Sequence, residues 1–425
     1  MPNRRAPSVE RLLFAALLCA GSYGCAAEEE PHGTPIGAIV PFTGVSAASG
    51  SNYERAMLLG IEYLNREADA SGRTFRLVAH DSHSTMDRTL SSLGKLLDED
   101  VLGVIGPDGV ELVQGVRQNL GGRRLSHVLP SSVTLEDFSS DDSGLLVRPA
   151  PAAEFVGCAL ANRVYGDLDA RLVVVHAEDA YRHALATATV SSFESYRFAA
   201  REGHGLALAL PEDSDDYVAS VTAAASFEPD TIVIAADAPI AAGWIRAWST
   251  LRRERVHWFF EPGLRSDEFL RNVIASSVEG AAGISLALPD EVESFDVVYA
   301  KRWNGETPGV ESHRYFDAVV AIGLASLVAE RELGREPTAE EVAPYVLRVI
   351  RGPGTSVSWH ALDRAVALVG EGKPIHYVGA AGRWAVDATG TSDGTAAIFD
   401  FWRVRDGAIV PEKFGACPAG TIRSP

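Results

Sequence analysis

Cysteine and positive charge are both scarce in this chain. Four of its 425 residues are cysteines, and no two of them have the Cys-x-x-Cys spacing of a metal or redox site. Lys and Arg number 38 against 57 Asp and Glu, which gives a formal net charge of −19. Nucleic-acid binding depends largely on basic side chains that neutralise phosphates, so this composition argues against a nucleic-acid partner. Beyond residue 24, no apolar stretch reaches the roughly 20 residues that span a membrane.

The first 24 residues have the pattern of a secretory signal, with three arginines ahead of the short apolar run 12–20. Small residues follow that run, and Gly24 directly precedes Cys25. This ending resembles a bacterial lipobox, in which the cysteine is lipid-modified and becomes the mature N-terminus. We therefore expect a signal peptide over 1–24, lipidation of Cys25 and a polar tether over 25–32. The alternative is ordinary cleavage nearby, which would discard Cys25 or leave it unmodified.

The body of the chain alternates short β-branched runs with helical patterns, which predicts βαβ units and a mainly parallel sheet. From Tyr53 to Leu64, apolar residues recur at spacings of three and four, as on an amphipathic helix. The rhythm breaks at 148–151 and restarts, and the length suffices for two cores. The predicted strands are 36–40, 76–80, 103–105, 126–129, 171–176, 231–235 and 257–260, with late short strands near 375–378, 383–386 and 396–404.

Polar loops follow several of these strands directly. Pro41–Gly44 follows the first strand, Gly106–Gly109 the third and Pro130–Ser132 the fourth. In an open parallel sheet, such loops lie at the carboxyl ends of the strands. Backbone N–H groups and helix N-termini can receive an anionic ligand group there. We therefore expect the ligand site at this edge of the sheet.

Seven segments spread over the chain beyond the tether carry a family resemblance. They are Pro35–Gly44, Leu77–Asp81, Gly103–Pro107, Leu129–Ser132, Val147–Pro149, Tyr315–Val319 and Ile375–Gly382. In this order and spacing they resemble type I periplasmic solute-binding proteins, of the branched-chain amino-acid-binding group that serves ABC transporters. The resemblance implies the periplasmic-binding-protein type I fold of class α/β. Two Rossmann-like lobes with mainly parallel sheets would be joined by a three-segment hinge, with ligand trapped between them.

The resemblance also implies where each lobe begins and ends. Cys158 and Cys417 would then fall in the same lobe, and we predict a disulfide between them. Two separate buried thiols are the alternative. The implied limits are 33–147 plus 284–375 for lobe 1, and 150–283 plus 376–425 for lobe 2.

Carried over by position, the resemblance assigns ligand contacts to both lobes. Backbone N–H groups and hydroxyls suit a carboxylate, whereas Asp237 and Glu261 would hold an ammonium. Asp108 begins a stretch where relatives have a serine run, and Val133 stands where they have a threonine, so the ligand class stays open. The assigned residues are Asp108, Gly109, Val110, Ser131, Ser132, Val133 and Thr134 in lobe 1, and Tyr181, Asp237 and Glu261 in lobe 2.

The implied function is that of an extracytoplasmic lipoprotein, periplasmic or at the cell surface, touching the membrane through its lipid only. It would capture a small polar ligand, with amino-acid-like solutes favoured, for an ABC permease in the inner membrane. No enzymatic activity, cofactor or metal is expected. The alternatives are a ligand sensor acting on a separate partner and a lipid-anchored hydrolase. Gly390–Gly394 fits the five-residue pattern of a nucleophile elbow, but no histidine follows residue 376.

Overall fold

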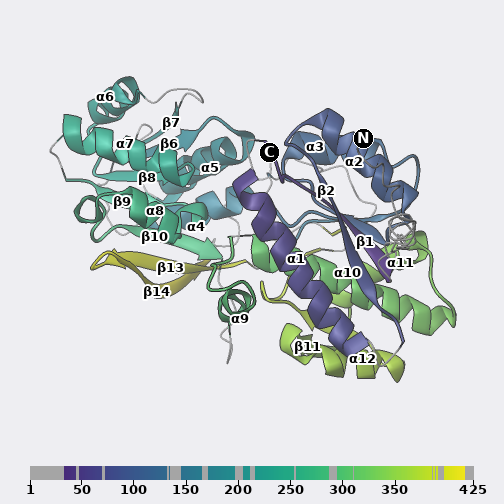
Figure 1. The fold of residues 1–425 in the computed structure, drawn as a ribbon. Coiled ribbons are helices and arrows are strands. Elements are labelled where there is room, and N and C mark those ends of the chain that lie inside the picture. The colour runs from purple at the N-terminus through teal and green to yellow at the C-terminus, as the bar shows by residue number, and fades with distance from the viewer. Residues whose placement is uncertain are drawn as a thin grey trace, which may run out of the picture.

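The computed structural model shows two α/β lobes side by side (Figure 1). Helix α1 (Ala47–Ala68) crosses the front of one lobe, and the second lobe carries the strands β6 to β10. The part of the chain that the structure describes comprises residues 33–44, 47–68, 72–131, 134, 145–164, 171–196, 204–210, 216–252, 255–286, 294–309, 311–384, 386–387, 389–390 and 397–416. No helix in these ranges is long and apolar enough to cross a membrane.

Lobe 1 is built on a five-stranded parallel sheet with the strand order β2-β1-β3-β4-β5. Strand β1, the second in this order, is buried on both faces from Ile36 to Val40, as expected for a parallel sheet covered by helices. Its even- and odd-numbered residues point to opposite faces, so Ile36 and Ile39 belong to two different core clusters. The strands are β1 (Thr34–Val40), β2 (Phe75–Asp81), β3 (Gly103–Ile105), β4 (Ser126–Val128) and β5 (Leu146–Val147).

Helices cover both faces of this sheet. On one face α1 packs with the long helix α10 (Ser312–Leu333), and on the other lie α2 (Met86–Asp98) and α3 (Val110–Gln118). A third layer of shorter elements completes the lobe beside α10. These elements are α9 (Phe295–Arg302), α11 (Ala339–Arg351), β11 (Thr355–Ser358), α12 (Leu362–Gly370) and β12 (Ile375–Val378).

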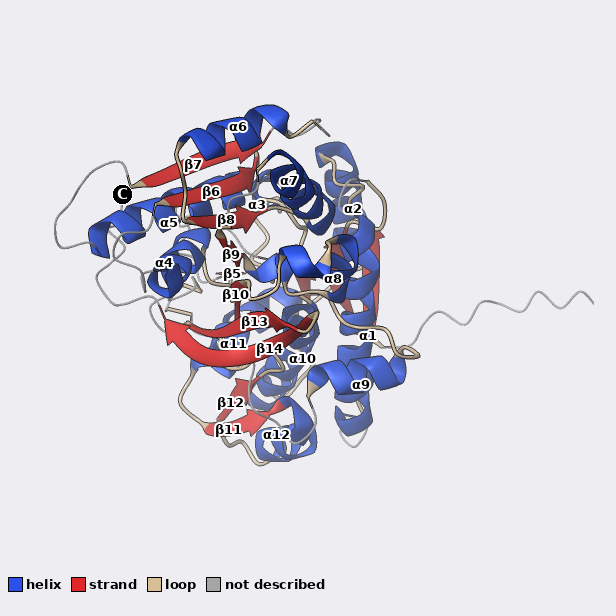
Figure 2. Cartoon of the chain, turned by 90° about the vertical axis from the view of Figure 1, so that its left-hand side faces the viewer, coloured by secondary structure: helices blue, strands red, loops and turns tan. Residues whose placement is uncertain are grey.

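Lobe 2 has a seven-stranded sheet with the order β14-β13-β10-β9-β8-β6-β7 (Figure 2). The pairs β10–β13 and β13–β14 are antiparallel, and the others are parallel. Two helices cover one face, and three cover the other. The strands are β6 (Leu172–Ala177), β7 (Gly205–Leu210), β8 (Thr231–Ala235), β9 (His257–Phe260), β10 (Ala282–Leu286), β13 (Ile398–Arg405) and β14 (Ala408–Ala416). The helices are α4 (Ala153–Val164) and α5 (Ala180–Tyr196), then α6 (Val218–Ser226), α7 (Ala238–Leu251) and α8 (Asp267–Asn272).

Packing places two of the predicted lobe boundaries later in the chain. All of β10 pairs within the lobe 2 sheet, although the sequence sets the boundary at 283/284. Trp384 and Val386 belong to the core of lobe 1, although the sequence assigns everything from residue 376 to lobe 2. We therefore propose that the chain returns to lobe 2 between Val386 and β13.

The seven strands predicted between residues 36 and 260 all exist, within two residues at each end. Of the stretch 383–386, expected as a strand, Arg383 and Trp384 are in no strand, Val386 forms only an isolated bridge, and residue 385 lies outside the described residues. Trp384 and Val386 are buried in the core of lobe 1.

Candidate ligand site between the lobes

The carboxyl ends of three neighbouring strands in lobe 2 bring three acidic side chains together. Asp179 follows β6, Asp237 follows β8 and Glu261 follows β9, and these strands are adjacent in the sheet. Because parallel strands all end at the same edge, residues far apart in the chain meet there. The resulting acidic cluster lies at the start of helices α5 and α7.

Arg182, in the first turn of α5, is bound by all three carboxylates of this cluster. Its Nε donates to Glu261 Oε1 at 2.9 Å, its Nη1 to Asp179 Oδ2 at 3.0 Å and its Nη2 to Asp237 Oδ1 at 2.6 Å. Asp179 also accepts the backbone N–H of Arg182 at 2.8 Å, which fixes the start of the helix. Burial alone would lower the pKa of Arg182, but the three carboxylates raise it above its ordinary value.

Asp108 of lobe 1 lies near the acidic cluster of lobe 2 and its arginine, Arg182. It lies in the loop between β3 and α3, where Gly109 has a φ of 100° that a residue with a side chain would rarely adopt. Burial raises the pKa of the Asp108 carboxyl, although the Ser131 hydroxyl and the Gly109 N–H lower it in part. The charges of Arg182 and Asp237 also act on Asp108, so both lobes contribute to one electrostatic environment.

Aromatic rings and hydroxyls surround Asp108 within lobe 1. The rings of Tyr53 and Tyr315 are stacked, with centroids 4.0 Å apart and planes at 13°. The Ser131 and Tyr315 hydroxyls are buried without a hydrogen bond of regular geometry within the described ranges, although the Ser131 hydroxyl is close enough to Asp108 and to Tyr315 to lower the pKa of both. Burial raises the pKa of Tyr315, so its hydroxyl stays protonated and can donate to a ligand. A ligand beside Asp108 would therefore meet one carboxyl group and two hydroxyls.

A second buried arginine lies under the tyrosines of lobe 1. Arg314 donates from Nε to the carbonyl oxygen of Pro130 at 2.7 Å and forms an ion pair with Glu311. Burial lowers the pKa of Arg314 to about 10, and Tyr181 of lobe 2 and Tyr53 act electrostatically in the opposite sense. Tyr181 and Arg314 thus form a second electrostatic connection between the lobes.

The structure brings together five of the ten ligand contacts assigned from the sequence, namely Asp108 and Ser131 in lobe 1 and Tyr181, Asp237 and Glu261 in lobe 2. Gly109 caps α3, and Val110 begins that helix and packs against the small cluster around Val113. Thr134 is buried, and Ser132 and Val133 lie outside the described residues.

Sequence reasoning did not select Arg182, Arg314 or Tyr53 for the site. Tyr53 was assigned to the apolar stripe of its helix, which is correct for its ring but omits its hydroxyl. Arg182 follows Tyr181 directly, so a search for charges beside the assigned residues would have found it. Asp179 precedes Arg182 by three residues, but Asp237 and Glu261 lie 55 and 79 residues away, and no local motif indicates that they converge on it.

Within the described ranges, no group of three or more His, Cys, Asp or Glu side chains is placed to hold a metal ion. Of the Gly390–Gly394 segment considered as a nucleophile elbow, only Gly390 is described. Its carbonyl accepts the backbone N–H of Arg148 at 2.8 Å.

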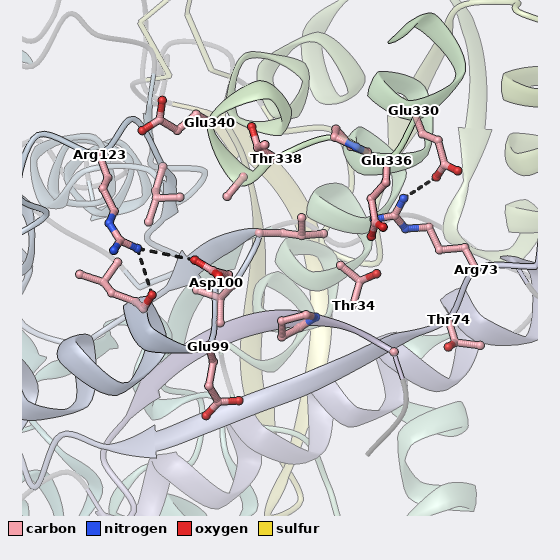
Figure 3. A pocket seen from close by; sticks show the side chains of 18 of the residues that line it. Thr34, Arg73, Thr74, Glu99, Asp100, Arg123, Glu330, Glu336, Thr338 and Glu340 are labelled. Atoms are coloured by element: carbon pink, nitrogen blue, oxygen red, sulfur yellow. Dashed lines mark hydrogen bonds and ion pairs between the residues drawn. The ribbon is translucent and has the colours of Figure 1, made fainter. Parts of the chain in front are cut away.

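A separate cavity of about 1020 Å³ lies at the opposite edge of the lobe 1 sheet, where β1 begins (Figure 3). Two arginines line it, and both are already paired. Arg73 donates to Glu330 and Glu336, and Arg123 lies near Asp100.

Residues 33–251 match the family model described as periplasmic binding protein, which is more than half of the chain. The chain belongs to the periplasmic binding protein family. Membership implies an extracytoplasmic location and the binding of a solute without its conversion. No relative among functionally curated proteins matches the sequence.

Solved structures share the fold of this periplasmic binding protein at low sequence identity. The leucine-binding protein LivK of Thermotoga maritima is 20% identical with a TM-score of 0.69, over 91% of this chain and 99% of that one. LivJ of Streptococcus pneumoniae, in complex with isoleucine, is 16% identical with a TM-score of 0.65, over 90% and 100%. A solute-binding protein of Rhodopseudomonas palustris, in complex with benzoate, is 12% identical with a TM-score of 0.64, over 91% and 97%.

Proposed function

We propose that this periplasmic binding protein captures a small polar solute between its lobes and delivers it to a separate ABC permease in the inner membrane. One observation carries the proposal. Charged and hydroxyl side chains of both lobes meet around Asp108 and Arg182, where a solute can contact each lobe. Amino-acid-like solutes are the leading class, supported by the isoleucine and leucine named for two relatives. The benzoate of a third relative indicates that the fold also accepts a ligand without an ammonium group.

The mechanism we propose is closure of the two lobes on the solute. A solute that touches Asp108 of lobe 1 and Tyr181 of lobe 2 binds the closed arrangement better than the open one. It therefore shifts the equilibrium toward closure, by as much as its affinity for the two arrangements differs. The three crossings between the lobes would act as the hinge. Release to a permease requires only that the permease favours the open arrangement, and no covalent step is needed.

Native mass spectrometry of the purified protein would detect a co-purified solute directly. A solute at 100 times its dissociation constant should stabilise the folded state by about 2.7 kcal/mol, which raises the melting temperature by roughly 2–4 °C. Tyr181→Ala should reduce this shift, whereas Tyr345→Ala, on helix α11 away from the site, should not. Conversion of the solute into a product, or equal shifts in both variants, would contradict the proposal.

We further propose that Cys25 carries lipid and anchors the protein to the membrane. The small residue Gly24 before Cys25 and the short apolar run upstream support this. The tether over 25–32 would then connect the lipid to Gly33, directly before β1. A lipid anchor keeps the binding protein close to its permease, which raises the effective concentration of the two partners.

A further inference from the structure

The acidic cluster of lobe 2 already holds a cation of the protein itself. Every nitrogen of the Arg182 guanidinium group donates to a carboxylate, one each to Glu261, Asp179 and Asp237. The side chain of Glu261 is only 3% exposed, and that of Arg182 is 20% exposed. The contact with Glu261 is charge-assisted and buried, where water competes poorly, whereas Asp179 and Asp237 are 41% and 67% exposed and hold the other two nitrogens at the surface.

A ligand ammonium would have to displace this guanidinium to reach Glu261. Displacement would move a charged arginine away from three carboxylates, and an ammonium offers no more charge in return. The carboxylates expected from the sequence to hold a ligand ammonium are therefore occupied. Arg182 stands where the cation of a free amino acid would bind.

The opposite lobe is equally unsuited to a ligand carboxylate. Asp108 lies in the loop assigned to the anionic end of the ligand, and it is a carboxylic acid itself. Two carboxylates in one buried position repel each other. The Tyr315 hydroxyl beside Asp108 can donate to a neutral carbonyl oxygen, as can the Ser131 hydroxyl once it turns from Asp108, and Asp108 can accept an N–H or O–H.

We propose that Arg182 is a built-in replacement for a ligand ammonium, and that Arg182 and Asp108 together make the site select an uncharged polar solute over a free α-amino acid. A primary amide of amino-acid size fits best. Its N–H₂ group would donate to Asp108, and its carbonyl oxygen would accept from Ser131 or Tyr315. This inference rests on the proposed function and narrows the class of its ligand.

Two sets of compounds test the ammonium and the carboxylate of the ligand separately. The compounds of each set share one side chain and differ in which of the two charges they carry. The first set is leucine, 3-methylbutylamine, 4-methylpentanoate and 4-methylpentanamide. The second is phenylalanine, 2-phenylethylamine, 3-phenylpropanoate and 3-phenylpropanamide. Titration calorimetry on the full-length mature protein, after removal of any co-purified solute, gives the affinities. In at least one set, the amide should bind the parent about tenfold or more tightly than the α-amino acid, as expected when buried charges are left unpaired.

Variants test whether Arg182 and Asp108 cause this selection. The double variant Asp108→Ser with Arg182→Gln empties the ammonium position and removes the opposing carboxylate, so the α-amino acid should gain at least about tenfold in affinity. The matched control Arg182→Lys retains the positive charge and should keep excluding the α-amino acid. Circular dichroism and a melting curve confirm that each variant is folded before it is titrated. If the double variant does not fold, Asp108→Ser alone should still relieve the rejection of 4-methylpentanoate and 3-phenylpropanoate.

The failure of this inference is distinguishable from failure of the proposed function. Tight binding of leucine or phenylalanine to the parent would overturn the inference and leave solute binding intact. No gain in the folded variants would overturn the roles assigned to Arg182 and Asp108. A parent that binds no compound of either set, and from which native mass spectrometry detects no co-purified solute, would overturn the proposed function and the inference together.

Discussion

Arg182 and Glu261 join helix α5 to the end of strand β9 through a hydrogen bond of 2.9 Å. The same guanidinium group reaches Asp237 at 2.6 Å, so two carboxylates from neighbouring strand ends share one cation. The two differ sharply in their surroundings. The side chain of Glu261 is 3% exposed, whereas that of Asp237 is 67% exposed. Loss of a buried charged hydrogen bond lowers the stability of a protein far more than loss of an exposed one. Glu261 and Asp237 should therefore contribute unequally to the free energy of unfolding.

Glu261→Gln should destabilise the folded protein by about 2 kcal/mol, because it removes one buried carboxylate from the guanidinium group of Arg182. Asp237→Asn is the matched control. It should cost less than about 1 kcal/mol, because water screens an exposed ion pair. Urea denaturation followed by circular dichroism measures both values. Equal losses in the two variants would show that burial does not distinguish the two contacts.

A buried aspartate should make stability depend on pH. Asp317 of α10 accepts hydrogen bonds from the Tyr377 hydroxyl and the N–H groups of Ala380 and Ala381, at 2.9, 2.7 and 2.9 Å. Burial nevertheless raises the pKa of Asp317 to about 6, from its ordinary 3.8. Between these values the folded state binds more protons than the unfolded state. The contribution of Asp317 to stability is therefore fully present below pH 4 and is lost as the pH rises through 6.

The comparison of parent and Asp317→Asn isolates this titration. As the pH rises from 4 to 7, the parent should lose about 2 kcal/mol relative to the variant. The asparagine cannot accept every hydrogen bond that the carboxylate accepts, which gives a constant offset, so the difference in slope is the informative quantity. Free energies of unfolding at several pH values supply it. Parallel curves over this range would mean that Asp317 ionises in the folded protein as it does in the unfolded chain.

The loop that surrounds Asp317 requires a glycine at one position. A Cβ atom at Gly379 would collide with the carboxylate of Asp317. Gly379→Ala should therefore lower stability by about 2 kcal/mol, as overpacking of a well-packed interior does. Gly370→Ala, at the end of α12, meets no atom within 4 Å and should cause no loss. Melting temperatures of the two variants and the parent test this requirement for glycine. A Gly379→Ala protein as stable as the parent would contradict it.

Most parallel strands of both lobes could be predicted, because the residue types within each strand favour a buried strand by themselves. Strands such as β8, with the sequence Thr-Ile-Val-Ile-Ala, combine β-branched residues with complete burial. Strand β7 was missed because Gly205–Leu210 consists of glycine, alanine and leucine, which favour no strand by themselves. It forms because it pairs with β6 along its whole length, which is a tertiary effect.

The candidate site could be predicted only in part, for a related reason. The loop 106–109 after a predicted strand is visible in the sequence, and the family resemblance assigned Asp108, Asp237 and Glu261 to the site by position. The partner of the last two could not, because Arg182 lies 55 residues from Asp237 and 79 from Glu261. Whether an acidic residue is free to bind a ligand depends on such distant contacts. The sequence therefore predicted an open ammonium site where the structure holds an arginine.

Lipidation should decide where the protein is found in the cell. We expect the mature chain to begin at Cys25 with attached lipid, because Gly24 and Cys25 follow a short apolar run. Intact-mass measurement of membrane-extracted protein should show the mass of residues 25–425 plus the lipid. Cys25→Ser should move the protein from the membrane fraction to the aqueous fraction without changing its fold. An unmodified N-terminus downstream of Cys25 would rule this expectation out.

The last prediction concerns the two remaining cysteines. Cys158 on α4 is completely buried and disulfide-bonded, whereas Cys417 lies outside the described residues. Strand β14 ends one residue before Cys417 and lies against α4, since Arg163 of α4 donates to Glu412 of β14 at 2.8 Å. We therefore expect Cys158 and Cys417 to be partners in the exported protein.

A bridge that closes so long a loop should stabilise the folded state by about 5–6 kcal/mol at most in the chain-entropy model. Cys417→Ser should accordingly lower the free energy of unfolding, and reductant should lower that of the parent while leaving the variant unchanged. Cys417→Ser is preferable to a change at Cys158, because serine at that buried position would add a second, unrelated loss. Non-reducing peptide mapping of exported protein gives the direct test. Recovery of both residues as free thiols would exclude the bridge, and any loss of stability in Cys417→Ser would then need another cause.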